Sequence, residues 1–398
     1  MAIMKQLNIC NLYIFIWVLY MFHWQEVGAA FPLLDSLSNV FLGFNLLISI
    51  YYSFIFWVKY KQNAIFKCIN LLILSFVIYG FFSILERDYV GIGGRHINSG
   101  TYLIGALRTF LPIYTCFIFT TLGYITEKTI RLWSWVFFAQ CIYIYFVSRF
   151  VIFGLNYGDF GELITNNTAY LFVSAFPLIY FHKNKPIIQY VLIAILLFFT
   201  ITSIKRGAIL IVTIATFYFF MHTLKKATFK IKLLTVVVLL ALVYAGIDVV
   251  ADLYENSDTF QHRVETTFEG NSSGRDKIAS ILFNIYINSD IIHLILGYGA
   301  DGTLDVLAYA HNDWLEMLFD QGIWGLLLFF SFWILLFEQW KKQEVNKNSL
   351  AFFLGLWLIC NFTRTFFSMW YSMANIMVTM PLGYYFATLD SEKRKLLK

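Results

Sequence analysis

The feature that most limits how this chain can fold is a series of long apolar runs. Stretches of about 18 or more mainly apolar residues recur along the whole sequence, and each is long enough to cross a bilayer core of roughly 30 Å. Hydrophobic residues make up 59% of the 398 residues and charged residues only 13%, which is too apolar for a soluble fold. A soluble α/β protein would contain turn-bounded apolar runs of about 4–8 residues. The sequence therefore predicts an all-α, polytopic membrane protein.

We expect about twelve transmembrane helices. Charged residues gather in the short gaps between the apolar runs, and Lys205-Arg206 is the only break between the seventh run and the eighth. No internal repeat is evident, so a transporter built from sequence-similar halves has no support. The expected spans lie near 7–24, 37–57, 66–85, 101–123, 131–153, 164–181, 187–204, 206–222, 231–250, 318–338, 349–369 and 371–389.

Basic residues predict the orientation of these helices, because cytoplasmic loops are enriched in Lys and Arg. Lysine-rich gaps alternate with gaps that contain few basic residues, and the C-terminal tail is also basic. Both termini are therefore expected in the cytoplasm. The chain divides into helices one to nine in 1–250, a large extracytoplasmic loop in 251–313, and three further helices with a cytoplasmic tail in 314–398. The net charge of +5 follows from this topology and is no sign of nucleic-acid binding.

Neither the N-terminus nor the cysteines point to processing or to a metal centre. The apolar stretch after Lys5 resembles a signal peptide but is long for one, so we interpret it as an uncleaved first span. The five cysteines lie in or beside apolar runs, with no Cys-X-X-Cys pair and no Cys/His cluster. They are expected to be packing residues rather than disulfide partners or zinc ligands. We expect neither a metal nor a cofactor.

The segment 251–313 is the one region long enough to fold outside the bilayer. Its beginning is acidic, and residues 269–274 form a flexible, glycine-containing stretch. The apolar residues from Ile278 to Leu296 follow helical spacing, which predicts a surface helix capped by Ser272 or Ser273. Gly297-Tyr-Gly299 then predicts a turn before the next helix.

From His311 onward the sequence predicts an apolar helix with two marked faces. At steps of four and three residues, one stripe contains His311, Leu315, Leu318, Gly322 and Gly325. This stripe would point the imidazole into the protein and let the glycines pack closely against a neighbouring helix. The second stripe contains Asp313, Glu316 and Asp320. A simple capping role for His311 stays open, and Asp313 and Asp320 are expected to be ordinary helix-entry and interfacial charges.

Arginines on the outer side gain nothing from the preference for positive charge inside, so they need another explanation. An unpaired Arg within a span costs roughly 2.5–3.5 kcal/mol on insertion scales. Structural pairing is the favoured interpretation for Arg108 and Arg364. Arg206 and Arg275 lie in glycine-flanked turns whose backbone an anion can approach, which favours a functional role.

Taken together, these motifs resemble the O-antigen polymerase and ligase superfamily. The resemblance rests on their order along the chain: Ser203-Ile-Lys-Arg206-Gly-Ala, Ser273-Gly-Arg275, Gly297-Tyr-Gly299, His311-Asn-Asp-Trp-Leu315 and Gly322-Ile-Trp-Gly325. The motifs cover roughly 200–325, whereas 1–200 matches only as hydrophobic spans. One departure is Ile204-Lys205, inside a motif that is usually closer to Ser-Arg-Gly.

The resemblance implies a GT-C-like fold and glycosyl transfer at the outer leaflet of the bacterial inner membrane. The donor would be an oligosaccharide repeat unit on undecaprenyl pyrophosphate, polymerised into an O-antigen or capsule. A flippase and a chain-length regulator would be its candidate partners, together with membrane lipid. Transfer would be independent of metal, because guanidinium groups can bind the developing charge of a pyrophosphate leaving group.

The resemblance also implies roles for individual residues. The residues expected to bind the pyrophosphate are Arg206, Arg275, Lys205 and Arg364. His311, with an ordinary imidazole pKa near ~6.5, would accept the proton of the acceptor hydroxyl. Glu316 and Asp313 would be further catalytic candidates that orient His311.

Three alternatives stay open. An O-antigen ligase would transfer the glycan to lipid A core, and the residues do not separate it cleanly from a polymerase; the His–Asn pair and compact C-terminal part favour the polymerase. A flippase or exporter of lipid-linked oligosaccharides should place charges along several spans on both sides of the membrane midplane, whereas here they collect outside. A scaffolding protein would leave Arg206, Arg275 and His311 individually dispensable.

Overall fold

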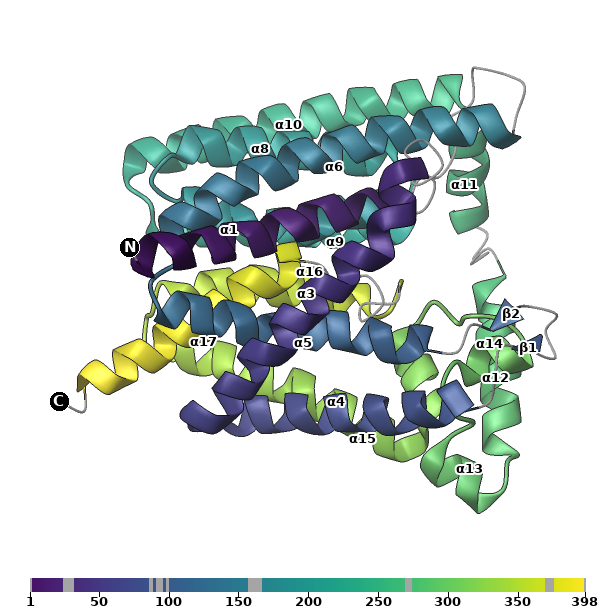
Figure 1. Ribbon diagram of the computed structural model, residues 1–398. Coiled ribbons are helices and arrows are strands. Elements are labelled where there is room, and N and C mark those ends of the chain that lie inside the picture. The colour runs from purple at the N-terminus through teal and green to yellow at the C-terminus, as the bar shows by residue number, and fades with distance from the viewer. Residues whose placement is uncertain are drawn as a thin grey trace.

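The computed structural model describes residues 2–23, 32–85, 89–90, 96–97, 100–156, 167–268, 274–368 and 376–396. Most of its long helices run roughly side by side in one bundle, and α3 crosses them obliquely (Figure 1). Strands β1 (Tyr89–Val90) and β2 (His96–Ile97) form a two-residue antiparallel pair. Every other regular element in the described residues is an α-helix or a 3₁₀-helix, which confirms the all-α membrane class.

The helices have the following bounds in chain order. They are α1 (Ala2–Tyr20), η1 (Met21–His23), α3 (Pro32–Lys59), α4 (Ala64–Leu85), α5 (Thr101–Thr121), α6 (Glu127–Asn156), α7 (Ala169–Ala175), η2 (Phe176–His182), α8 (Pro186–Thr202), α9 (Arg206–Lys226), α10 (Phe229–Asn256), α11 (Asp258–Phe268), α12 (Arg275–Ile287), α13 (Ile291–Leu296), α14 (Gly302–Val306), α15 (Asp313–Val345), α16 (Leu350–Arg364) and α17 (Ile376–Leu396).

Each of the expected apolar runs overlaps a helix, but twelve membrane crossings are not confirmed. Seven of the described helices are long and apolar enough to cross a membrane: α3, α4, α5, α6, α9, α10 and α15. Apolar segments in α1, α7–η2, α8 and α16 are shorter. The run near 164–181 shows one reason for the difference: Pro177 lies at the start of η2, where the chain changes from an α-helix to a 3₁₀-helix.

Helix α5 lies at the centre of the bundle, packed against α3, α4 and α17. Its crossing with α17 is close at Gly383, where an added Cβ would come within 2.7 Å of the Cys116 Cβ. All five cysteines are buried and free, as expected for packing residues. By contrast, α10 buries few of its residues and presents long apolar side chains on its outer surface. This pattern suits a helix that faces lipid.

The two chain termini lie at one end of the bundle, and α11, α12, α13 and α14 lie at the opposite end (Figure 1). This arrangement agrees with the expectation that the termini and the segment 251–313 are on opposite sides of the membrane. Which of these sides is the cytoplasm stays a prediction. The pair of short strands lies at the same end as α12 and α14 (Figure 1).

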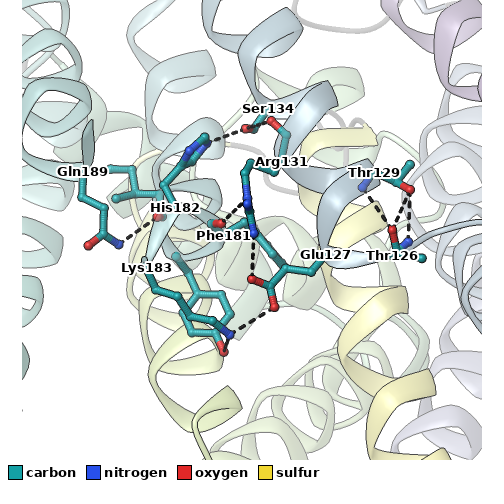
Figure 2. A network of polar contacts seen from close by, with 11 residues as sticks. Thr126, Glu127, Thr129, Arg131, Ser134, Phe181, His182, Lys183 and Gln189 are labelled. Carbon is teal, nitrogen blue, oxygen red and sulfur yellow. Dashed lines mark hydrogen bonds and ion pairs between the residues drawn. The ribbon is translucent and has the colours of Figure 1, made fainter. Parts of the chain in front are cut away.

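A polar network joins the start of α6 to the end of η2 (Figure 2). The Arg131 Nε donates to the carbonyl of Phe181 at 3.0 Å, and its Nη2 donates to Glu127 at 3.1 Å. The Lys183 ammonium reaches the second oxygen of the same Glu127 carboxylate, also at 3.1 Å. Arg131 and Lys183 therefore hold these two helices together.

The expected surface helix from Ile278 to Leu296 is two helices, α12 and α13. Asp290 causes the break, because its carboxylate accepts the backbone N–H groups of Ile292 and His293 and so begins a new helix. Gly274, with φ 79°, occupies the N-cap position of α12. The expected caps Ser272 and Ser273 lie outside the described residues.

Candidate functional site

His311 precedes helix α15 and does not belong to its apolar stripe. The helix begins at Asp313, because the Asn312 side chain caps it by accepting the N–H groups of Trp314 at 3.0 Å and Leu315 at 3.3 Å. His311 has a left-handed φ of 52° and is exposed. The expectation that helical spacing points its imidazole into the protein was therefore wrong. The chain turns before the helix starts, so the imidazole is presented from a loop.

Two buried groups fix the backbone around His311. The Glu316 carboxylate, 1% exposed, accepts the backbone N–H of His311 at 3.0 Å. A carboxylate of the first helical turn that reaches back across the cap resembles a capping box. The Asp313 N–H donates to the Thr365 carbonyl at 2.9 Å, which attaches the start of α15 to the turn after α16. Glu316 thus supports His311 through the backbone.

Gly322, one of the two glycines of the expected stripe, lies where the backbones of two segments approach closely. Gly322 has non-helical angles, with φ 66° and ψ −165°, and it kinks α15. The turn at Gly297 lies directly against this kink. The Tyr298 N–H donates to the backbone carbonyl of Phe319 at 2.8 Å, and the Gly299 N–H donates to the backbone carbonyl of Asp320 at 3.0 Å. A Cβ on Gly297 would come within 2.5 Å of the Gly322 nitrogen. Both positions therefore require glycine.

The acidic residues of the second stripe are buried inside the protein. Asp313 is 0% and Asp320 is 2% exposed, so the expectation of interfacial charges was wrong, whereas Asp313 does lie at the helix entry, as the first residue of α15. Asp320 accepts the N–H of Thr303 at 3.2 Å and so supports the start of α14. Asp301, the N-cap of α14, is also buried, and this burial raises its pKa from 3.8 to about 6. In the part of the chain that the structure describes, no three His, Cys, Asp or Glu side chains are grouped to hold a metal ion.

A cavity of about 810 Å³ opens between α7, α9, α11 and α12 and the loops at 310–312 and 366–367. Four of the residues expected to form a site line it: Lys205, Arg206, Arg275 and His311. Asp276 is the acidic residue among the lining side chains, against the three cations. The rest of the wall is mainly apolar, with side chains such as Ile204, Ile209, Leu210, Phe260, Val264 and Phe366. The cavity therefore combines three cationic side chains with a mainly apolar lining.

A tight turn brings Lys205 and Arg206 to this cavity. Ile204 has a φ of 53°, an uncommon value for a β-branched residue that costs roughly 1–3 kcal/mol. Its side chain is buried in a small cluster with Leu253 and Phe260, which compensates for the backbone strain. Lys205 is the N-cap of α9 and Arg206 its first residue. The start of a helix, with its unpaired N–H groups and positive dipole end, is a suitable place to bind an anion.

Arg275 is oriented by a carbonyl that sequence reasoning missed. Its Nη1 donates to the Phe367 carbonyl at 3.1 Å, and the Tyr170 hydroxyl donates to the same oxygen, also at 3.1 Å. Phe367 lies in the turn after α16, and Tyr170 lies in the first turn of α7. Neither residue stands out in the sequence, because both are aromatic residues in or beside apolar runs.

Arg364 does not line the cavity, although the sequence made it a candidate for binding the substrate. Its side chain is 1% exposed, and its Nη1 donates to the Ser174 hydroxyl at 2.8 Å. The guanidinium lies over the Tyr170 ring, 5.3 Å from the ring centre. The Arg108 Nη1 donates to the Tyr20 hydroxyl at 2.8 Å, a structural pairing as expected.

The fold and the cavity define a class: a polytopic helical membrane protein with a pocket lined by cationic and apolar side chains. Comparison with protein families gives a more specific answer. The O-antigen ligase family model matches residues 191–330, from α8 into α15, and this range contains Arg206, Arg275 and His311. The match, which covers about a third of the chain, supports its membership of the O-antigen ligase and polymerase superfamily. No curated protein matches the chain at a significant level.

Proposed function

We propose that the protein is a glycosyltransferase of the bacterial inner membrane that uses a polyprenyl-pyrophosphate-linked oligosaccharide as donor. The observation that carries this proposal is the cavity lined by Arg206, Arg275 and His311 and bounded by an apolar wall. A lipid pyrophosphate needs both kinds of surface, because its headgroup is anionic and its chain is apolar. The match to the O-antigen ligase family supports the same type of activity.

The cationic wall suits the leaving group of this reaction. Guanidinium groups bind phosphate oxygens through two parallel N–H donors, and such charge-assisted bonds are about twice as strong as neutral ones. Arg206 and Arg275 would hold the pyrophosphate, with Lys205 adding a point charge. As the bond between the anomeric carbon and the pyrophosphate oxygen breaks, the electron pair stays on the pyrophosphate. The same cations stabilise that growing charge in the transition state.

His311 would act as the general base. It lines the cavity, and the buried Glu316 carboxylate accepts its backbone N–H. The neutral imidazole would accept the proton of the acceptor hydroxyl while the hydroxyl oxygen attacks the anomeric carbon. The proton then passes to solvent, which reaches this exposed residue. General base catalysis contributes about 10²–10⁴-fold to the rate.

The acceptor decides between two forms of this activity. We favour a polymerase, which extends one lipid-linked glycan with a second and would receive its repeat units from a flippase and its chain length from a regulator. The second candidate is a ligase that transfers the glycan to lipid A core, and the match to the O-antigen ligase family is compatible with both forms. Purified protein in nanodiscs, supplied with lipid-linked repeat units alone, should yield longer chains if it is a polymerase. Product that forms only after lipid A core is added would identify a ligase.

The decisive test of the site is the His311→Ala variant. It should abolish glycan transfer in nanodiscs while membrane insertion and thermal stability stay at the wild-type level, because the side chain is exposed and precedes the helix. Chain-length distributions on gels measure the outcome. Normal product from His311→Ala would remove this residue from the mechanism.

A further inference from the structure

Tyr170 occupies a place in the cavity wall that the proposed mechanism does not yet use. It lines the cavity beside the first turn of α9, and its side chain is only 5% exposed. A Cβ on Gly207 would come within 3.0 Å of the Tyr170 hydroxyl oxygen, so the residue after Arg206 must be small for this hydroxyl to lie there. The hydroxyl is therefore next to the start of α9, where an anion is expected to bind.

The Tyr170 hydroxyl and Arg275 share one acceptor. Both donate to the Phe367 carbonyl at 3.1 Å, so the phenol oxygen and the guanidinium lie on the same side of the cavity. A phenol O–H can turn about its C–O bond without moving the ring. It can leave the carbonyl and donate to a phosphate oxygen while Arg275 keeps its place.

A buried cation lies behind the same ring. The Arg364 guanidinium packs over the Tyr170 ring, 5.3 Å from its centre, and is buried without lining the cavity. Its Nε and Nη2 have no hydrogen-bond partner within the described ranges. Burying the Arg364 charge with so few hydrogen bonds costs free energy. The contact with the Tyr170 ring, and any nearby anion, would offset part of that cost. A positive charge over the ring also favours partial negative charge on the phenol oxygen and strengthens the O–H as a donor.

We propose that Tyr170 is a third hydrogen-bond donor to the pyrophosphate, and that Arg364 is a positioning residue that supports it from behind the ring. This inference rests on the proposed function, because it names a further ligand of the same anion. The pyrophosphate would then meet the guanidinium groups of Arg206 and Arg275 and the neutral O–H of Tyr170. A neutral donor adds directional binding without the desolvation cost of a further charge.

Binding measurements on Tyr170→Phe test this inference. The variant keeps the ring that covers Arg364 and removes only the donor. Its Kd for undecaprenyl pyrophosphate, measured with purified full-length protein in nanodiscs, should rise about 10- to 100-fold, as expected for a lost hydrogen bond to a charged group. Its Kd for uncharged undecaprenol should stay at the wild-type value, because the apolar wall is unchanged.

Tyr190→Phe is the matched control. Its hydroxyl is also buried but bonds Thr235 at 2.6 Å, away from the cavity, so this variant should bind both lipids like the wild type. Equal loss of both lipids in Tyr170→Phe would show a packing role and overturn the inference. Wild-type binding by Tyr170→Phe, with binding lost in Arg275→Ala, would overturn it while the proposed function stands. Failure of the folded wild-type protein to bind undecaprenyl pyrophosphate would overturn both.

Discussion

At the scale of single residues, the site depends on backbone positions that are held by side chains elsewhere. His311 has a left-handed backbone, and the Glu316 carboxylate accepts its N–H. The sequence made Glu316 a candidate to orient the imidazole directly, whereas the bond in the structure goes to the main chain. A side chain that orients a backbone need not be charged, and this property distinguishes the two roles.

Substitution of Glu316 separates positioning from chemistry. Glu316→Gln keeps an oxygen that can accept the His311 N–H, so its activity should stay within a few-fold of the wild type. Glu316→Ala leaves the His311 N–H without this acceptor, at a cost of roughly 1–3 kcal/mol, and should lower kcat about tenfold or more. Steady-state transfer rates in nanodiscs measure both variants. If Glu316→Gln is as inactive as Glu316→Ala, the carboxylate itself takes part in the reaction.

Substitution of the cavity arginines by lysine tests the two-pronged contact. Arg206→Lys and Arg275→Lys keep the charge but lose the planar pair of donors, so donor KM should rise about tenfold or more in each. Arg108→Lys is the matched control, since Arg108 bonds Tyr20 and does not line the cavity. Wild-type KM in both cavity variants would exclude bidentate binding.

At the scale of elements, the end of the molecule that carries α12, α13 and α14 is assembled by the meeting of two irregular segments. The kink at Gly322 divides α15, and the turn at Gly297 fits against it, with α14 supported by the buried Asp320. Neither segment is regular by itself, so each depends on the other for its backbone hydrogen bonds. This contact places the loop that carries His311.

Alanine at Gly322 should damage this contact. The new Cβ would come within 2.6 Å of the Gly297 nitrogen, and φ is positive, so we expect a loss of about 2–4 kcal/mol and a lower Tm. Gly246→Ala in α10 is the control, since nothing lies within 4 Å of the added Cβ and alanine favours a helix. Equal Tm values for Gly322→Ala and the wild type would show that the two segments do not need this close approach.

The buried Asp301 predicts how stability varies with pH. Burial raises its pKa from 3.8 to about 6, so between these values the folded protein binds more protons than the unfolded chain. Stability should therefore fall as pH rises through this window and then level off above it. Asp301→Asn cannot ionise and should lack this decline. Melting curves at pH 4.5 and pH 7.5 measure it, and a wild-type Tm that rises across the window would contradict the expected sign.

At the scale of the whole molecule, topology and the proposed activity are linked, because the proposed lipid-linked donor would reach the site from one leaflet only. A cysteine introduced at the exposed Asn284 in α12 should react with an impermeant maleimide in spheroplasts, and one at Lys347 should react only after permeabilisation. The five native cysteines are buried, which keeps background labelling low. The reverse labelling pattern would invert the topology and place the cavity in the cytoplasm.

The amino-acid sequence was enough to predict that the protein is a polytopic helical membrane protein. Long apolar runs can satisfy their backbone hydrogen bonds in lipid only as helices or closed barrels, and their length suits helices, so composition and run length are sufficient. The order of the motifs around Arg206, Arg275 and His311 also predicted a resemblance to the O-antigen polymerase and ligase superfamily, which the family match at residues 191–330 supports. These properties are local or additive along the chain, and they need no knowledge of packing.

The tertiary structure alone decided which candidates share a cavity and which lie behind it. Helical spacing placed His311 on a buried stripe, but capping by Asn312 starts the helix later, and a cap depends on where the chain enters from a neighbouring element. Arg364 has the same residue type as Arg275, yet it packs over the Tyr170 ring and does not line the cavity. Contacts between residues distant in sequence depend on how helices pack, and a periodic pattern along one helix does not contain that information.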